Sequence, residues 1–141
     1  RAAGNLAPGD GGHVAGLGAR DLDPLEAEAL RESRVTVLSS DALMQGVGAL
    51  AEARDVLAGA AQLYLHIDID VLDQAVAPGV DFPTSGGLSV AQLAEVARGV
   101  AGLGKLAAVS LTAVNPEKDV EGRTARAALD VLAAVFAPEA R

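Results

Sequence analysis

The chain contains 141 residues, of which 50% are hydrophobic and only 2% aromatic, and its formal net charge is −8. This length suits one compact domain or part of a larger one. Because 11 Lys and Arg residues stand against 19 Asp and Glu residues, the chain lacks the basic surface that phosphate binding requires, and we expect no nucleic-acid partner. The absence of cysteine excludes disulfides, thiolate metal sites and a cysteine nucleophile.

The chain has two histidines, His13 and His66, so it cannot build a three-histidine metal site by itself. No stretch long enough to span a bilayer lacks a charge or a glycine, and no basic region precedes an apolar run. We therefore expect a cytoplasmic protein without a membrane partner.

Strands and helices are predicted to alternate along the chain after a Gly-, Ala- and Pro-rich loop at 1–12. Short apolar runs predict strands, and amphipathic stretches predict helices. In chain order we expect a strand at 13–19, a helix at 24–32, a strand at 35–38, a helix at 40–57, a strand at 63–69, a helix at 89–100, a strand at 106–111 and a helix at 122–136.

Local signals support several of these elements. Asp23 and Pro24 are typical of a helix start, and Ser89 followed by Gln92 matches a capping box. Residues 70–88 are expected to form a long ordered loop. In the last helix, one apolar stripe is predicted to consist of Ala125, Leu129, Leu132, Ala133 and Phe136. The alternation as a whole favours a doubly wound, parallel α/β sheet with helices on both faces.

The segment from Leu65 to Asp73 holds the residues most informative about function. An ionised carboxylate in an apolar strand is costly unless it is paired or metal-bound, yet this segment contains Asp68 and Asp70. The spacing of two places both acids and His66 on one face, at the carboxyl end where open α/β sheets bind ligands. Since a divalent cation relieves the repulsion between two carboxylates, we predict an oxygen-rich site for Mn²⁺ or Mg²⁺.

Other interpretations of the same residues remain open. Asp68 and Asp70 could instead cap the strand end and the helix beyond. His66 is as well explained by a hydrogen bond beside the acids as by a role as metal ligand or proton carrier, and His13 is expected at the surface. The acids also resemble the aspartate pair of haloacid-dehalogenase-like phosphatases, but Leu72 stands where those have Thr or Val, and it also excludes an EF-hand.

Three segments together resemble the arginase (ureohydrolase) family, which includes arginase, agmatinase and formiminoglutamase. The acid-bearing run, continued by Ala-Pro-Gly-Val and Gly-Gly-Leu-Ser, is similar to the family's second metal-binding signature. The other two segments are similar to its Gly-x-Arg-Asp-x-Asp-Pro and Val-Asn-Pro segments. In this chain the three lie at 65–89, 17–24 and 114–116.

The resemblance implies a doubly wound α/β fold, here incomplete, in which residues 1–141 are the C-terminal part of a single arginase-like domain. It also implies a binuclear manganese centre, with Asp68 bridging the two ions and Asp70 binding one. A hydroxide that bridges the metals would then attack the guanidino or formimino carbon. The family fills the position of His66 variably, so the resemblance does not make it a ligand.

The chain departs from the family pattern in two respects. It lacks the upstream His and Asp-x-His-x-Asp ligands, so we expect it to bind manganese only weakly by itself. In addition, Ala113 replaces the acid that holds a substrate guanidinium, which removes a charge-assisted partner.

Two functions are compatible with these features. The first is a manganese-dependent hydrolase that cleaves a linear C–N bond of a small guanidino, formimino or similar amidine compound, and that forms a homo-oligomer as the family suggests. The alternative is a catalytically inactive homologue that acts as a binding or structural subunit. Ala113 favours the alternative, whereas Asp68 and Asp70 favour the enzyme.

Overall fold

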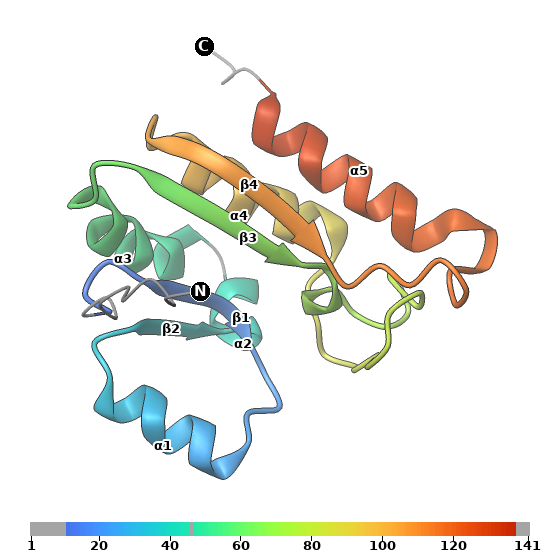
Figure 1. Cartoon of the computed structure of the whole chain (residues 1–141), viewed down its shortest axis with the longest axis horizontal. Coiled ribbons are helices and arrows are strands. Elements are labelled where there is room, and N and C mark those ends of the chain that lie inside the picture. The colour runs from blue at the N-terminus through green and yellow to red at the C-terminus, as the bar shows by residue number, and fades with distance from the viewer. Residues whose placement is uncertain (1–10, 46, 138–141) are drawn as a thin grey trace, which may run out of the picture.

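Strands and helices alternate along the chain as the sequence predicts. The computed structural model describes residues 11–45 and 47–137. The elements in chain order are β1 (Ala15–Ala19), α1 (Pro24–Glu32), β2 (Thr36–Ser39), α2 (Ser40–Met44), α3 (Val47–Ala58), β3 (Leu63–Asp68), the 3-10 helix η1 (Ile69–Val71), α4 (Val90–Ala101), β4 (Leu106–Thr112), the 3-10 helix η2 (Val120–Gly122) and α5 (Arg123–Phe136) (Figure 1).

The strands form two separate two-stranded sheets within the described residues. β1 pairs in parallel with β2, and α1 connects them. β3 pairs in parallel with β4, and α4 connects them, with Asp68 opposite Thr112 in the register. The chain is therefore two βαβ units joined through α2 and α3, which is the parallel α/β class that the sequence predicts.

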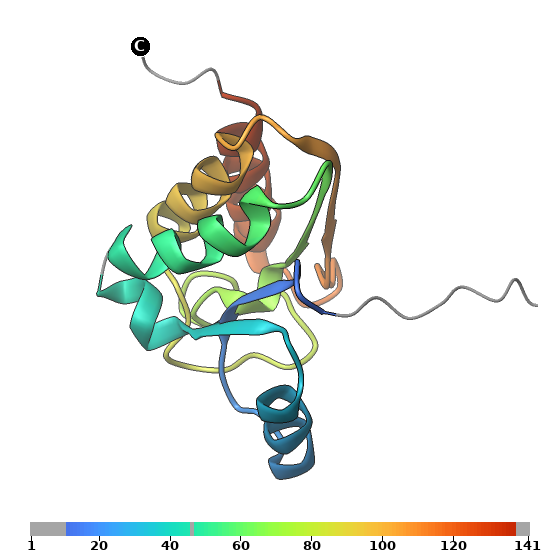
Figure 2. The same cartoon turned by 90° about the vertical axis from the view of Figure 1, so that its left-hand side faces the viewer.

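The helices lie unevenly around the strands. α4 and α5 pack against each other on one side of β3 and β4, with α3 beside α4, whereas the opposite face of these strands carries no helix among the described residues (Figure 2). α1 lies apart from this layer and buries none of its residues (Figure 1). No helix in the described part of the chain is both long and apolar enough to cross a membrane.

The loop between β3 and α4 belongs to the core. The loop and η1 supply four of the six largest fully buried side chains, which are Ile69, Leu72, Val80, Leu88, Val131 and Thr124. Leu72 and Leu88 form an isolated parallel bridge that closes the loop at its base. The predicted long ordered loop at 70–88 is thus packed beneath the carboxyl end of β3, where it supports Asp68 and Asp70.

The single helix predicted over 40–57 is wrong, because the structure divides it into α2 and α3. α2 begins after Ser39, whose hydroxyl accepts a backbone N–H, and ends at Met44 with Gln45 as its C-cap. The next residue in the sequence is Gly46, which lies outside the described residues.

The apolar stripe predicted on the last helix is not the face that the structure buries. Leu129 and Phe136 are 64% and 72% exposed. The buried face consists instead of Thr124, Ala127, Ala128, Val131, Ala134 and Val135. α5 is apolar on both sides, and the side with smaller residues packs against α4 because small side chains let two helices approach closely.

Gly87 provides a test of the loop packing. A Cβ at this position would collide with the backbone of Leu72 and Asp73. We expect Gly87→Ala to lower the free energy of unfolding by about 2 kcal/mol, measured by urea denaturation. Gly16→Ala is the matched control, since its Cβ would meet only Val37 Cγ2 at 4.0 Å; equal losses in the two variants would contradict the packing.

Candidate metal centre

Asp68 and Asp70 lie together at the carboxyl end of β3. Asp68 is the last residue of the strand, and Asp70 lies in η1 directly after it. Asp68 Oδ1 accepts the backbone N–H of Asp70 at 3.1 Å, so Asp68 caps this short helix. Capping and metal binding are compatible, because a carboxylate has two oxygens with several acceptor positions.

The electrostatics of the pair suit a cation. Partial burial raises the pKa of Asp70, the neighbouring Asp68 carboxylate raises it further, and the charge of Arg20 opposes both effects. A divalent cation bound between the two side chains would offset the effect of Asp68 on Asp70. The donor set therefore fits Mn²⁺ or Mg²⁺ in its chemistry.

The number of ligands is smaller than such an ion takes. Nowhere in residues 11–45 and 47–137 do three His, Asp or Glu side chains come together in a group that could hold a metal ion. Since Mg²⁺ and related hard cations take about six ligands, Asp68 and Asp70 supply only part of a coordination shell.

Arg20 holds the turn that carries the acids. Its Nη1 donates to the carbonyl of Val71 at 2.9 Å, and its Nη2 donates to the carbonyls of Asp70 and Leu72. Arg20 follows β1, so the side chain ties the carboxyl end of one βαβ unit to that of the other. In the sequence, Arg20 stands out only as part of the Gly-x-Arg-Asp-x-Asp-Pro segment. Its role in positioning the turn is visible only in the structure.

The hydrogen bonds of His66 go to β4. Its Nδ1 lies 2.8 Å from Ser110 Oγ and its Nε2 lies 3.5 Å from Thr112 Oγ1, both on β4. The Tyr64 hydroxyl shares the same Ser110 oxygen at 2.6 Å. His66 thus belongs to a polar cluster on the uncovered face of the sheet. His13 is exposed, as predicted.

Ala113 lies directly beyond β4, next to the residue that pairs with Asp68. Its φ of 70° lies in the left-handed region, as does the φ of 53° at Asp21 just beyond β1. For a residue other than glycine this conformation costs roughly 1–2 kcal/mol. Strained backbone is typical of functional sites, and here it occurs at the carboxyl ends of strands from both sheets.

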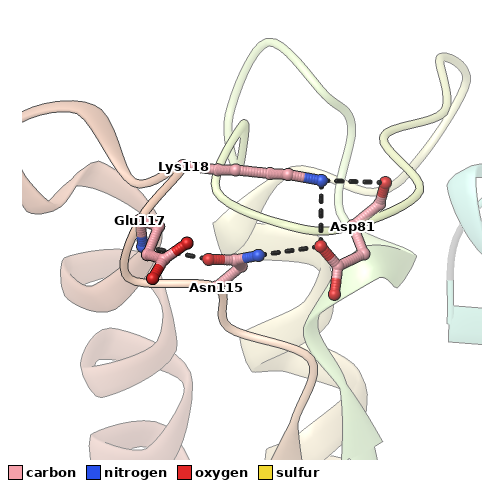
Figure 3. A network of polar contacts seen from close by, with 4 residues as sticks. All are labelled: Asp81, Asn115, Glu117 and Lys118. Atoms are coloured by element: carbon pink, nitrogen blue, oxygen red, sulfur yellow. Dashed lines mark hydrogen bonds and ion pairs between the residues drawn. The ribbon is translucent and has the colours of Figure 1, made fainter.

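A polar network fastens the loops that follow β3 and β4 (Figure 3). Asp81 Oδ1 accepts hydrogen bonds from Asn115 Nδ2 at 2.8 Å and Lys118 Nζ at 2.9 Å. The hydrogen bond from Lys118 lowers the pKa of Asp81, with Asn115 adding to the effect. Asn115 also accepts the Glu117 N–H at 2.9 Å. The network anchors the loop that begins with Ala113.

The comparison with protein families decides the assignment. The model of the arginase family matches residues 3–137 of this chain. The chain belongs to the arginase family. Among curated relatives, it is 45% identical to a formimidoylglutamase of Nocardia farcinica over 80 residues, which are 57% of this chain and 26% of that protein. It is 31% identical to an arginase of Brucella melitensis over 133 residues, 92% of this chain and 44% of that protein.

Solved structures of the arginase family have the same fold. An arginase from Bacillus subtilis superposes with a TM-score of 0.86 at 25% identity, covering 93% of this chain and 50% of that one. A formimidoylglutamase from Bacillus subtilis gives a TM-score of 0.82 at 26% identity, covering 89% and 41%. These likenesses confirm the predicted fold class. The chain spans half or less of the length of each of these proteins.

The role of Arg20 can be tested by substitution. A lysine carries its N–H donors on a single nitrogen and cannot reproduce the planar fork of Arg20, whose two terminal nitrogens reach three carbonyls. We therefore expect Arg20→Lys to loosen the 69–72 turn. Backbone amide exchange in this turn should accelerate about tenfold, measured by NMR. Arg31→Lys on the exposed face of α1 is the control. If amide exchange in the 69–72 turn is unchanged in the Arg20 variant, the turn is stable without the Arg20 hydrogen bonds.

Proposed function

We propose that this chain is the C-terminal part of a manganese-dependent hydrolase that cleaves a linear C–N bond in a guanidino, formimino or related amidine compound. The observation that supports the proposal is the carboxylate pair Asp68 and Asp70 at the carboxyl end of β3 in an arginase-family chain. The names of relatives agree with this class of substrate, since they include formimidoylglutamase, guanidinopropionase and arginase. In this proposal the complete protein is a cytoplasmic homo-oligomer.

The proposed roles divide among three residues. Asp68 and Asp70 would hold manganese through carboxylate oxygens, together with ligands from outside this chain. Bound manganese would supply Lewis-acid activation of water. Arg20 keeps the Asp70 backbone in place through its hydrogen bonds to consecutive carbonyls, so the acids are positioned before a metal arrives.

The substrate pocket would differ from that of a family member with an acid at position 113. Ala113 offers no charge to a guanidinium, so we propose that a substrate of this protein is anchored by another group. The same residue favours the second candidate function, a non-catalytic homologue that keeps the fold as a binding or structural subunit.

Metal binding gives the direct test. In calorimetry the 141-residue chain should bind Mn²⁺ weakly, because two carboxylates form an incomplete shell. Asp68→Asn and Asp70→Asn should each weaken this binding by about tenfold or more. Asp130→Asn, on the exposed side of α5, is the control for the loss of one negative charge. Binding that is tight and binuclear, or that survives both substitutions, would contradict the assignment.

Position 113 gives a test of substrate choice. The assay protein joins this chain to the part of Brucella melitensis arginase outside the matched 133 residues. We expect Ala113→Glu to raise kcat/KM for a guanidino substrate by about tenfold or more, because a charge-assisted hydrogen bond contributes roughly 1.5–3 kcal/mol. Ala113→Gln should give a smaller rise. No difference between glutamate, glutamine and alanine would mean that the pocket uses another anchor.

A further inference from the structure

The loops that follow β3 and β4 meet close to the acids of the candidate metal centre. The backbone N–H of Asn115 donates to the carbonyl of Gly79 at 2.8 Å, and the Asn115 side chain donates to Asp81 Oδ1. Asn115 lies three residues beyond Thr112, which pairs with Asp68 in the strand register. Because consecutive Cα atoms are about 3.8 Å apart, Asn115 Cα lies within about 11 Å of Thr112 Cα. The contact between the loops thus borders the carboxyl end of β3.

Lys118 brings a positive charge to this contact (Figure 3). Its Nζ donates to Asp81 Oδ1 at 2.9 Å and lies 3.5 Å from the Asp81 carbonyl oxygen. Within the part of the chain that the structure describes, these contacts engage at most two of the three N–H donors of the ammonium. The Lys118 side chain is also 51% exposed. An N–H donor therefore remains for a ligand that approaches from solvent.

Two arginines at this end of the molecule are bound to backbone carbonyls instead. Arg20 donates to three carbonyls of the 70–72 segment, and Arg123 Nη2 donates to the carbonyl of Ala75. Their guanidinium groups hold the loop after β3 in place. Lys118 differs from both, because its side-chain partner is a single exposed residue. Of these three cations, Lys118 is the best placed to meet a negatively charged group of a ligand.

Two uncharged side chains lie in the same loops. Ala113 is exposed and lies between Thr112 and Asn115 along the chain. Phe82 directly follows Asp81 and is 81% exposed, although burial of a phenylalanine ring is favourable. Neither side chain offers a charge to a ligand, and both can pack against methylene groups. The surroundings of Lys118 therefore suit a ligand with an apolar chain and a charged end.

We propose that Lys118 binds a carboxylate at one end of the substrate, while the amidine end of the substrate lies at Asp68 and Asp70. The substrate class is then a linear amidino carboxylic acid, in which methylenes join a guanidino or formimino group to a carboxylate. This inference rests on the proposed function, and it names the anchor that Ala113 does not provide. A substrate with charges at both ends can be held from either end, and here the protein holds the carboxylate.

Asp81 positions the ammonium for this role. The hydrogen bond from Lys118 lowers the pKa of Asp81, and the hydrogen bond from Asn115 adds to the effect, so Asp81 is ionised at neutral pH and keeps its attraction for Nζ. A lysine side chain that is already held loses less conformational entropy when a ligand binds. The ion pair thus prepares Lys118 for a second carboxylate.

The same ammonium selects among amidines by the group at their far end. A carboxylate there accepts a charge-assisted hydrogen bond from Lys118, whereas a methyl group accepts none. An amine there places two positive charges next to each other, which disfavours binding. Lys118 is therefore a specificity-determining residue for the part of the substrate that does not react.

The test measures ligand binding to the 141-residue chain by NMR, with a chelator present. The probes are γ-guanidinobutanoate and butylguanidine, which differ only by a carboxylate in place of a methyl group. We expect γ-guanidinobutanoate to bind at least about threefold more tightly, a modest factor because the charge pair is half exposed. It should also shift the NMR resonances of the Lys118 side chain, which butylguanidine should leave in place.

Three variants identify the residue responsible. Lys118→Met removes the ammonium and keeps an unbranched side chain, so we expect it to abolish the difference in affinity between the two probes. Lys118→Arg keeps the charge and should keep the difference. Arg31→Met, on the exposed face of α1, also removes one positive charge and should leave the difference unchanged.

Four results would overturn the proposal. These are binding of neither probe, equal affinity for the two probes, a difference that persists in Lys118→Met, and a difference that Arg31→Met abolishes as well. Because the chelator removes metal ions, none of these results depends on manganese binding or hydrolysis. A Lys118-dependent difference in a chain that fails to bind Mn²⁺ in calorimetry would support this anchor and contradict the proposed function.

Discussion

The guanidinium of Arg20 links the carboxyl ends of the two βαβ units of this chain. Two βαβ units stand next to each other without a shared hydrogen-bond ladder. Apolar packing joins them on the helix side, and the guanidinium joins them at the carboxyl ends by donating to consecutive carbonyls. Because Arg20 binds backbone rather than side chains, it constrains the path of the turn while leaving the carboxylates of Asp68 and Asp70 available for other partners.

A second constraint is that the loop after Asp70 is closed by hydrogen bonds to Asp73. Asp73 accepts the backbone N–H groups of Ala75 and Gly86, each at 2.8 Å, and these bonds lower its pKa. Asp73 thus has the opposite environment to Asp70, only three residues earlier, whose pKa burial and Asp68 raise. Asp73 stabilises the loop through these hydrogen bonds, whereas the surroundings of Asp70 disfavour its ionised form.

Local signals in the sequence predicted most elements, and tertiary packing decided what they missed. Asp23 and Ser89 cap helices as expected. The spacing of Asp68 and Asp70 predicted both acids on one strand, but β3 ends at Asp68 and Asp70 lies in η1. The buried face of α5 could not be predicted, because both sides of that helix are apolar and the neighbour selects between them. The contacts of Arg20 span about 50 positions in the chain, a separation at which local patterns carry no information.

The backbone conformation of Ala113 affects which substitutions its position can accept. The left-handed backbone at this position is imposed by its surroundings, because β4 precedes it and the network of Asp81 and Asn115 holds the loop that follows. The hydrogen bonds that hold this loop come from other residues, although a β-branched side chain would be strongly disfavoured at a left-handed position. Exchange of Ala113 for another unbranched residue would change the group that follows Thr112, the partner of Asp68 in the strand register, and would remove none of the side-chain hydrogen bonds that hold the loop.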